Sequence, residues 1–143
     1  MKIFVYLNTL ILLIFSPLAQ ASCWQQAEKS FGIEAKLLKA IAQVESGMKP
    51  NAVGRNNNGS YDVGLMQINS SHFPRLRKLG IDAKKMKADP CLSVLVGASI
   101  LSDMMKIYGY SWEAVGAYNA GLHKSRRDLR MRYARRVWTH YNK

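Results

Sequence analysis

Residues 45–69 read ESGMKPNAVGRNNNGSYDVGLMQIN and place two carboxylates, Glu45 and Asp62, on either side of a turn-rich loop. Before this stretch, residues 33–44 carry apolar side chains at the spacing of one buried helix face, which predicts a helix that Glu45 closes just before Gly47. That spacing puts Glu45 on the apolar stripe of the helix and away from its lysines. Poor hydration and the negative end of the helix dipole both favour the protonated acid. The sequence therefore predicts a carboxyl group that keeps its proton near neutral pH.

A protonated acid of this kind is what cleavage of a glycosidic bond requires, because the leaving oxygen must be protonated as its C–O bond breaks. A frayed, solvated helix end is the alternative for Glu45. The asparagine-rich loop over residues 51–60 suits tight turns. Residues 61–69 alternate weakly between polar and apolar side chains, which predicts a short strand or one arm of a hairpin. We therefore interpret residues 45–69 as an active site.

The chain contains three short blocks, Glu45-Ser46-Gly47, Gly64-Leu65-Met66-Gln67 and Ala117-Tyr118-Asn119-Ala120-Gly121. Together they resemble the signature motifs of the family 1 lytic transglycosylases. The small secreted members that serve secretion systems, conjugation and pili are the best match. Residues 57–70 are also similar to animal c-type lysozymes, in which the residue matching Asp62 is the second catalytic carboxylate, whereas most lytic transglycosylases have no such aspartate. The three blocks follow one another in the family's order over about 80 residues, which makes the signal specific.

The resemblance implies roles for individual side chains. Glu45 is then the catalytic acid, and Asp62 is a second catalytic carboxylate that stabilises or traps the glycosyl cation. A tyrosine beside the acid could fix the rotamer of its carboxyl, and side-chain amides suit N-acetyl sugars. For Asp62 the alternative is a structural residue that caps the turn before Gly64, and for Tyr118 it is packing alone. The predicted substrate-binding residues are Ser46, Met66, Gln67, Tyr118 and Asn119.

The implied reaction is cleavage of the β-1,4 bond between N-acetylmuramic acid and N-acetylglucosamine in peptidoglycan. Glu45 acts first as acid and then as base on the muramoyl C6 hydroxyl, which closes a 1,6-anhydro ring. Two alternatives stay open: lysozyme-like hydrolysis that uses Asp62, and an inactive lysozyme-like fold kept as a cationic binding module. The resemblance further implies that the protein opens the wall for a secretion or pilus apparatus, whose components would be its partners. It implies no cofactor.

The first 21 residues have the pattern of a secretory signal peptide. They contain one lysine, an apolar run from Ile3 to Phe15 and a small-residue end that predicts cleavage after Ala21. The apolar run is shorter than the roughly 20 residues that a membrane span needs, so no stable span is expected after cleavage. Residues 22–143 would then form one periplasmic domain, expected to be a monomer.

Two cysteines, Cys23 and Cys91, remain after this cleavage. An oxidising compartment favours disulfides, so we expect one bridge between them; two reduced, buried thiols are the alternative. The histidines are scattered singly and neither cysteine has metal-ligand spacing to one of them, so no metal site is predicted.

Capping and periodicity predict a mainly α (α+β) fold with a small β element near residues 60–69. The resemblance implies that this is a single lysozyme-like domain. Lys84, Lys85 and Lys87 are expected in an exposed turn. The last helix carries Tyr133 and Trp138 at core spacing, with its arginines on the other faces. This last helix is predicted over residues 127–141. Further helices are predicted over residues 22–31 with Ser22 as N-cap, 70–79 before Gly80, 90–108 after Asp89, and up to residue 120 after the N-cap Ser111.

The chain has a net charge of +12, and loss of Lys2 with the signal leaves +11. Such a charge attracts polyanions. A secreted chain meets little nucleic acid, and the basic residues are not interleaved with aromatics in a known binding pattern, so no nucleic-acid partner is predicted. Peptidoglycan carries peptide carboxylates and is the predicted anionic substrate; arginines that merely solvate a helix face are the alternative.

Overall fold

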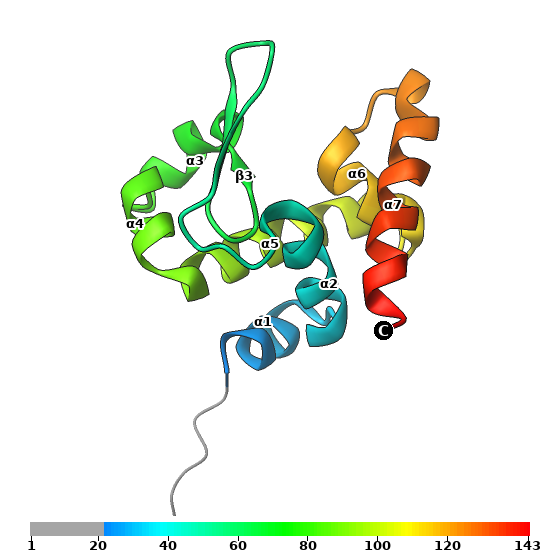
Figure 1. The fold of residues 1–143 in the computed structure, drawn as a ribbon, viewed down its shortest axis with the longest axis horizontal. Coiled ribbons are helices and arrows are strands. Elements are labelled where there is room, and N and C mark those ends of the chain that lie inside the picture. Colours follow the sequence, from blue (N-terminus) through cyan, green and yellow to red (C-terminus); the bar gives the residue numbers. More distant parts are fainter. Residues whose placement is uncertain (1–21) are drawn as a thin grey trace, which may run out of the picture.

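The computed structural model describes residues 22–143, so the predicted signal peptide, residues 1–21, lies outside the described part of the chain. Helices dominate the described residues, with one small sheet beside them (Figure 1). This confirms the expected mainly helical domain with a small β element. In chain order the elements are α1 (Cys23–Phe31), α2 (Ala35–Ser46), β1 (Val53–Arg55), β2 (Tyr61–Val63), β3 (Ile68–Asn69), η1 (Ser70–His72), α3 (Phe73–Arg77), α4 (Ala83–Ala88), α5 (Pro90–Tyr108), α6 (Trp112–Ala120), η2 (Lys124–Arg126) and α7 (Arg127–Tyr141).

Local sequence signals begin and end the first two helices. Ser22 and Gln25 form a capping box at the start of α1: the Ser22 hydroxyl accepts from the Gln25 amide at 3.3 Å, and Gln25 Oε1 accepts from the Ser22 amide at 2.9 Å. Gly47 ends α2 in the left-handed conformation (φ 59°), which glycine adopts without steric cost. The helix therefore stops just after Glu45, as predicted.

The sheet is an antiparallel meander in the order β1-β2-β3. Asp62 lies in the central strand, paired with Gly54 on one side and Asn69 on the other. The predicted single strand over residues 61–69 is in fact two strands, because Gly64 (φ 81°) and Gln67 (φ 50°) turn the chain between them. A Cβ added at Gly54 would lie 3.0 Å from Gln67 Oε1 and 3.8 Å from Asp62 Oδ2, so these two side chains are neighbours.

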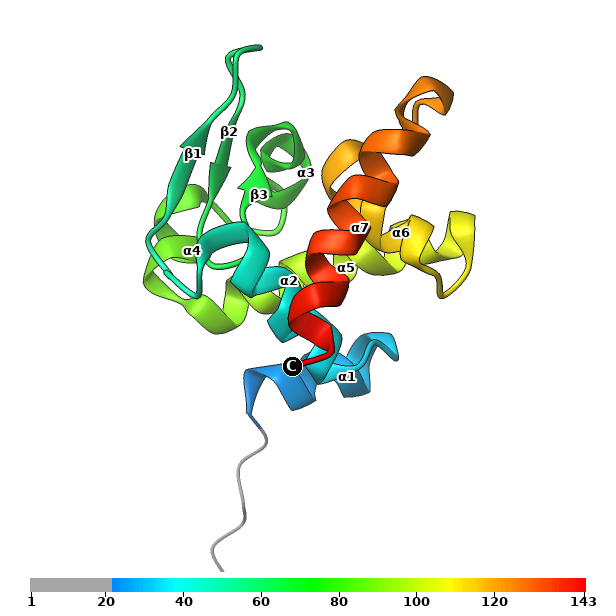
Figure 2. The same ribbon diagram turned by 45° about the vertical axis from the view of Figure 1, so that its right-hand side comes forward.

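The long helix α5 crosses the middle of the molecule (Figures 1 and 2). Asp89 caps its start by accepting from the Leu92 amide at 3.2 Å. By length and composition alone α5 could span a membrane, but it has seven buried residues and packs against α1, α4 and α6. Cys91 in its first turn forms the expected disulfide with Cys23 of α1, with a Cα–Cα distance of 5.1 Å.

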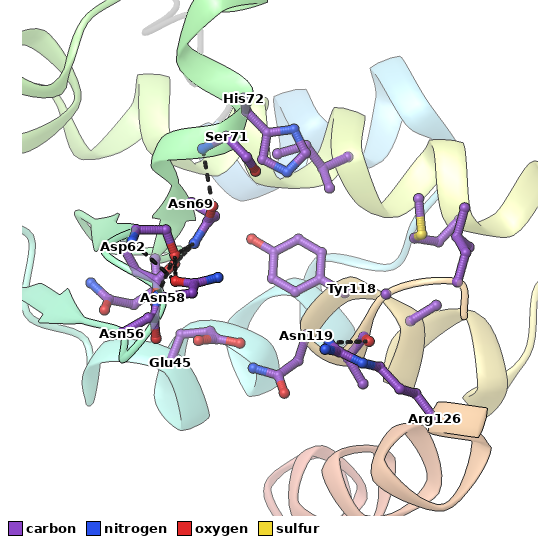
Figure 3. A pocket seen from close by; sticks show the side chains of 18 residues that line it. Glu45, Asn56, Asn58, Asp62, Asn69, Ser71, His72, Tyr118, Asn119 and Arg126 are labelled. Atoms are coloured by element: carbon purple, nitrogen blue, oxygen red, sulfur yellow. Dashed lines mark hydrogen bonds between the residues drawn. The ribbon is translucent and has the colours of Figure 1, made fainter. Parts of the chain in front are cut away.

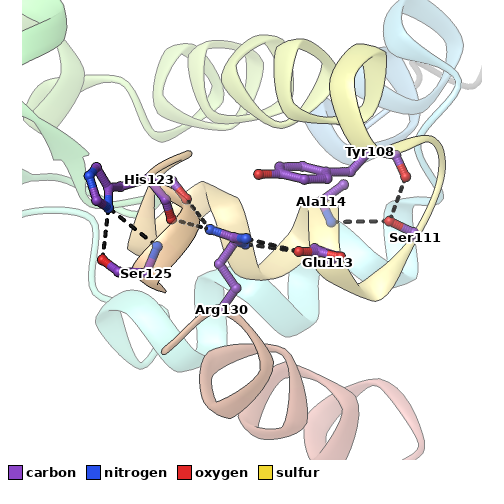
Figure 4. A network of polar contacts seen from close by, with 8 residues as sticks. Tyr108, Ser111, Glu113, Ala114, His123, Ser125 and Arg130 are labelled. Atoms are coloured by element: carbon purple, nitrogen blue, oxygen red, sulfur yellow. Dashed lines mark hydrogen bonds and ion pairs between the residues drawn. The ribbon is translucent and has the colours of Figure 1, made fainter. Parts of the chain in front are cut away.

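Helices α6 and α7 pack so closely that a Cβ on Gly116 would collide with the backbone of Arg130. Arg130 itself is 3% exposed, so the prediction that it lies with the other arginines, off the core face of the last helix, is wrong. Its guanidinium binds the Glu113 carboxylate at 2.9 Å and donates to the carbonyls of Gly121 (3.2 Å) and His123 (2.9 Å), as Figure 4 shows. The side chain can be buried because Nε and both terminal nitrogens of its guanidinium have hydrogen-bond partners.

Three further predictions need correction. Trp138 is 53% exposed and does not join the core, because α2 and α6 cover only the neighbouring face of α7. Residues 70–79 form η1 followed by the short α3, with Pro74 in the first turn of α3, and not one continuous helix. The lysines of residues 84–87 are exposed but helical, because Asp82 accepts from the Lys85 amide at 2.8 Å and so begins α4.

Candidate active site

A cleft of about 590 Å³ opens between the sheet with η1 on one side and the C-terminal end of α6 on the other. This is the size of an ordinary small-ligand site. The end of α2 contributes Glu45 to it, and the side chains of α5 form part of its floor. Five of the predicted site residues line it, and Figure 3 shows four of them around one space: Glu45, Asp62, Tyr118 and Asn119, with Gln67 the fifth.

Glu45 has a strongly perturbed acidity. Burial raises its pKa from the ordinary 4.5 to about 7, against a hydrogen bond from Tyr133 that lowers it. The negative charge of Asp62 raises this pKa further, and the positive charge of Arg136 lowers it. Near neutral pH this carboxyl can therefore both give and take a proton, as the sequence predicted from its place on the helix.

Tyr133 of α7 holds the Glu45 carboxyl by donating its hydroxyl hydrogen to Oε1. Sequence reasoning assigned this role to Tyr118 and placed Tyr133 in the core. Tyr118 donates to the Met66 carbonyl at 2.7 Å instead, and so ties α6 to the sheet turn. Burial and then the charge of Glu45 raise the pKa of both phenols, so both remain donors. The rule that a buried tyrosine hydroxyl needs a partner could have drawn attention to Tyr133.

Asp62 is oriented by two asparagines. Its Oδ2 accepts from the Asn56 amide group at 2.9 Å and its Oδ1 from that of Asn69 at 2.8 Å. Within residues 22–143 its carboxylate accepts no backbone hydrogen bond, so the geometry is not that of a turn cap. The two amide donors fix the orientation of the carboxylate and stabilise its negative charge. Asp62 lines the cleft.

Gln67 and Asn119 differ in what they can offer a ligand. The Gln67 Nε2 donates to the carbonyls of Ala52 (3.1 Å) and Gly64 (2.9 Å), whereas its Oε1 accepts no hydrogen bond from residues 22–143. Asn119 is exposed, and Figure 3 shows its amide directed into the cleft toward Glu45. It makes no side-chain hydrogen bond within the described residues, so both of its functions are open to a ligand.

Ser46 and Met66, which were predicted to bind substrate, are not among the described residues that line the cleft. The Ser46 hydroxyl donates to the Leu65 carbonyl at 2.7 Å and thereby joins the end of α2 to the sheet turn. Met66 is completely buried, and its side chain packs at Gly97, where an added Cβ would lie 2.9 Å from it. Both residues position the site without lining it, because the Ser46 hydroxyl is bound to backbone atoms and the Met66 side chain lies in the core.

The cleft also contains polar residues that sequence reasoning did not assign to it. All but Arg126 lie at the sheet side and at η1, whereas Arg126 belongs to η2, after α6. The asparagine run was a sequence signal for Asn56 and Asn58 alone. His72 is one of them, and burial followed by the nearby Arg75 lowers its pKa, so its ring is neutral at pH 7 and can both donate and accept. The others are Asn56, Asn58, Ser60, Asn69, Ser71 and Arg126. Residues 22–143 contain no cluster of three His, Cys, Asp or Glu side chains that could hold a metal ion.

Comparison with protein families finds a match to the transglycosylase SLT domain over residues 22–141. Similar curated proteins include Invasion protein IagB of Salmonella typhimurium, which is 66% identical over 87% of this chain and 78% of the relative. Protein IpgF of Shigella flexneri is 47% identical over 92% of this chain and 87% of its own length. A peptidoglycan-binding-like protein of Escherichia coli O157:H7 is 37% identical over 98% of this chain and 89% of that protein.

Among solved structures, an inactive mutant of the lytic transglycosylase Slt from Pseudomonas aeruginosa has a similar fold, with a TM-score of 0.67 and 23% sequence identity. The match covers 87% of this chain, which spans only 24% of the length of that structure. It supports the lysozyme-like arrangement of the helices around the cleft.

Proposed function

Because the chain belongs to the transglycosylase SLT family of peptidoglycan lytic transglycosylases, we propose that it cuts the β-1,4 bond between N-acetylmuramic acid and N-acetylglucosamine with Glu45 as the only acid–base group. The observation that carries this proposal is a carboxyl with a pKa of about 7 that lines a cleft together with a second carboxylate. An acid catalyst works best when its pKa lies near the working pH.

In the first step the protonated Glu45 gives its proton to the glycosidic oxygen as the bond from that oxygen to the muramoyl C1 breaks. The N-acetylglucosamine leaves with its hydroxyl, and C1 becomes an oxocarbenium-like centre. The Tyr133 hydroxyl, bonded to Oε1, stabilises the carboxylate that remains. Burial thus favours the acid before the step, and the hydrogen bond favours the base after it.

In the second step the Glu45 carboxylate takes the proton of the muramoyl C6 hydroxyl while the C6 oxygen attacks C1. A 1,6-anhydro ring closes, the acid is regenerated and no water is consumed. The same group serves both steps because a pKa near 7 leaves either protonation state accessible.

Asp62 supplies negative charge for the positive centre at C1 in both steps. Its two asparagine donors hold it in place before the reaction, so little reorganisation is needed as charge develops. The free Oε1 of Gln67 and the free amide of Asn119 are suited to the N–H and C=O of N-acetyl groups.

Lysozyme-like hydrolysis is the second candidate, because Asp62, which lines the cleft, matches the second catalytic carboxylate of the c-type lysozymes. Water would then capture C1 in place of the C6 hydroxyl. Mass spectrometry of muropeptides released from purified sacculi separates the candidates. We expect 1,6-anhydro ends; reducing ends would establish hydrolysis, and no release would leave an inactive binding module.

For the biological role, we propose that the protein opens the periplasmic wall locally for a secretion or pilus apparatus. The support is the name of the relative from Salmonella typhimurium, Invasion protein IagB, together with the signal-like residues 1–21. The test is export: a periplasmic fraction that contains the protein shortened after Ala21 is expected, and retention in the cytoplasm at full length would contradict the role.

A further inference from the structure

The start of α7 and the preceding η2 form the most basic segment of the described chain. Residues 124–136 contain seven lysines and arginines and one acid, Asp128, so they contribute 7 − 1 = +6 of the +11 that residues 22–143 carry. Figures 1 and 2 show this segment, in orange, across from the β1–β2 hairpin. Its exposed cations are Lys124, Arg126, Arg127, Arg132, Arg135 and Arg136.

None of these six cations takes part in an ion pair within residues 22–143, whereas the buried Arg130 is held by Glu113. Three of them line a groove of about 500 Å³ along the outer face of α7, with Asp128 and Met131 between them. Like charges on adjacent helix turns repel one another, so an anionic ligand would relieve this repulsion. The three groove arginines are Arg127, Arg132 and Arg135.

The groove begins in the chain directly after the last residue that lines the catalytic cleft. Arg126 lines the cleft and Arg127 lines the groove, and the two residues are consecutive in the chain. Arg126 is held at this junction by donating to the Ala120 carbonyl at 3.3 Å. A polymer whose sugars occupy the cleft and that extends past Arg126 would therefore pass the start of α7, where side branches of the polymer can reach Arg127.

We propose that this groove binds the carboxylates of the stem peptides on the same glycan strand whose sugars occupy the cleft. The proposal rests on the function proposed above. A guanidinium presents a planar pair of N–H donors that matches both oxygens of a carboxylate, which a lysine ammonium does not. Stem peptides recur along a glycan strand, so several carboxylates lie within reach of one helix face. The groove thus selects peptide-bearing strands over bare glycan.

The test uses protein with Glu45→Gln, so that substrate is not consumed during binding. Binding is measured to purified sacculi and to glycan strands from which an amidase has removed the peptides. The groove variant is Arg127→Gln with Arg132→Gln and Arg135→Gln. The matched control removes three exposed lysines of the α3–α4 region, with Lys78→Gln, Lys84→Gln and Lys87→Gln, and lowers the net charge equally.

We expect the groove variant to bind sacculi about 10-fold more weakly, as for the loss of three exposed ion pairs. Peptide removal should weaken binding of the unmodified groove to the same degree and have little further effect on the groove variant. The control should change binding by less than about 2-fold. If the triple variant does not fold by circular dichroism, Arg132→Gln alone provides the comparison.

Three outcomes would overturn the proposal: equal binding with and without peptides, equal losses in the two charge variants, or tighter groove-dependent binding to phosphatidylglycerol vesicles than to sacculi. The wild-type protein separates this proposal from the proposed function. If the wild-type protein releases 1,6-anhydro ends from peptide-free strands, the proposed reaction stands whether or not the groove binds peptides. If neither substrate is cleaved, the proposed function fails while the binding measurement still reports on the groove.

Discussion

At the scale of single residues, Glu45 is subject to two opposing influences. Burial raises its pKa, and the Tyr133 hydroxyl and the Arg136 charge lower it, with a result of about 7. Arg136 lies over the ring of Tyr133, with its guanidinium 5.4 Å from the ring centre. The balance matters more than either influence, since one carboxyl has to serve as acid and then as base.

We predict that Glu45→Gln abolishes wall degradation while the fold is kept, because the amide has the same shape but cannot give and retrieve the proton. Turnover on sacculi should fall below about 1% of wild type, since positioned acid–base groups contribute roughly 10²–10⁴-fold. Residual activity above this level would remove Glu45 from the acid role.

The same variant has a distinct stability profile that serves as its control. A folded-state pKa near 7 against 4.5 means that the native state binds this proton more tightly than the unfolded chain. Wild-type stability therefore falls as pH rises from about 4.5 to about 7. Glu45→Gln should be more stable than wild type at pH 8, by at most about 3 kcal/mol, and not at pH 4; equal melting curves at both values would contradict the perturbed acidity.

For Tyr133→Phe we predict a shift in pH dependence. The lost hydrogen bond stabilised the ionised carboxylate, so the pKa of Glu45 should rise above about 7 and the alkaline limb of the activity profile should move to higher pH. Tyr118→Phe is the matched control, since its hydroxyl binds a backbone carbonyl. Profiles of turnover against pH that shift equally in both variants would contradict a specific role for Tyr133.

Asp62→Asn should lower turnover by roughly 10- to 10³-fold, the range for one preorganised charge partner, without changing anhydro products into reducing ones. The charge acts on the oxocarbenium-like centre, which both routes share. Activity and melting temperature are measured on one preparation. Full activity per folded molecule with a lowered melting point would establish a structural aspartate instead.

At the scale of elements, each wall of the site is tied to its neighbour by one polar contact. The Ser46 hydroxyl ties the end of α2 to the sheet turn, and the Tyr118 hydroxyl ties α6 to the same turn. Arg130 clamps the loop after α6 to α7. Because of these contacts, short helices and strands of two or three residues are enough to hold the catalytic side chains.

The contact between α6 and α7 yields a prediction about packing. Gly116→Ala should destabilise the protein by about 1–3 kcal/mol or more, because the new methyl group meets the rigid backbone of Arg130 and forces the helices apart. Gly97→Ala is the comparison and should cost less, since the nearest atoms to its methyl group are those of the Met66 side chain, from 2.9 Å, and not the backbone of another helix. Chemical denaturation compares the two, and equal losses would show that the helix contact is adaptable.

At the scale of the whole molecule, the cleft lies between the sheet with η1 and the C-terminal end of α6, and α2 and α5 contribute residues between these two sides. The disulfide ties α1 to α5, and neither cysteine lines the cleft. The bridge therefore acts on folding stability and leaves the catalytic geometry to the helix contacts.

Reduction of this bridge should lower the melting temperature by on the order of 10 °C. Closing a loop of this length is worth roughly 4 kcal/mol in the chain-entropy model, which for a domain of this size is a shift of that order. Below the lowered transition, turnover should equal that of the oxidised protein. Free thiols in periplasmic material, or an unchanged melting curve, would contradict the prediction.

The sequence alone determined those parts of the protein that depend on neighbours along the chain. The capping residues and glycines set the ends of α1 and α2, the apolar stripe placed Glu45 at a buried helix end, and the three motif blocks identified the family. Only the tertiary structure decided which partner each polar side chain found. Tyr118 and Tyr133 are chemically alike, and the one that reaches Glu45 lies 88 positions away. Arg130 differs from its exposed neighbours only in facing Glu113 across the α6–α7 contact, and Met66 lies beside the active residues in sequence yet points into the core. Such choices follow from how distant elements pack, and no local pattern encodes them.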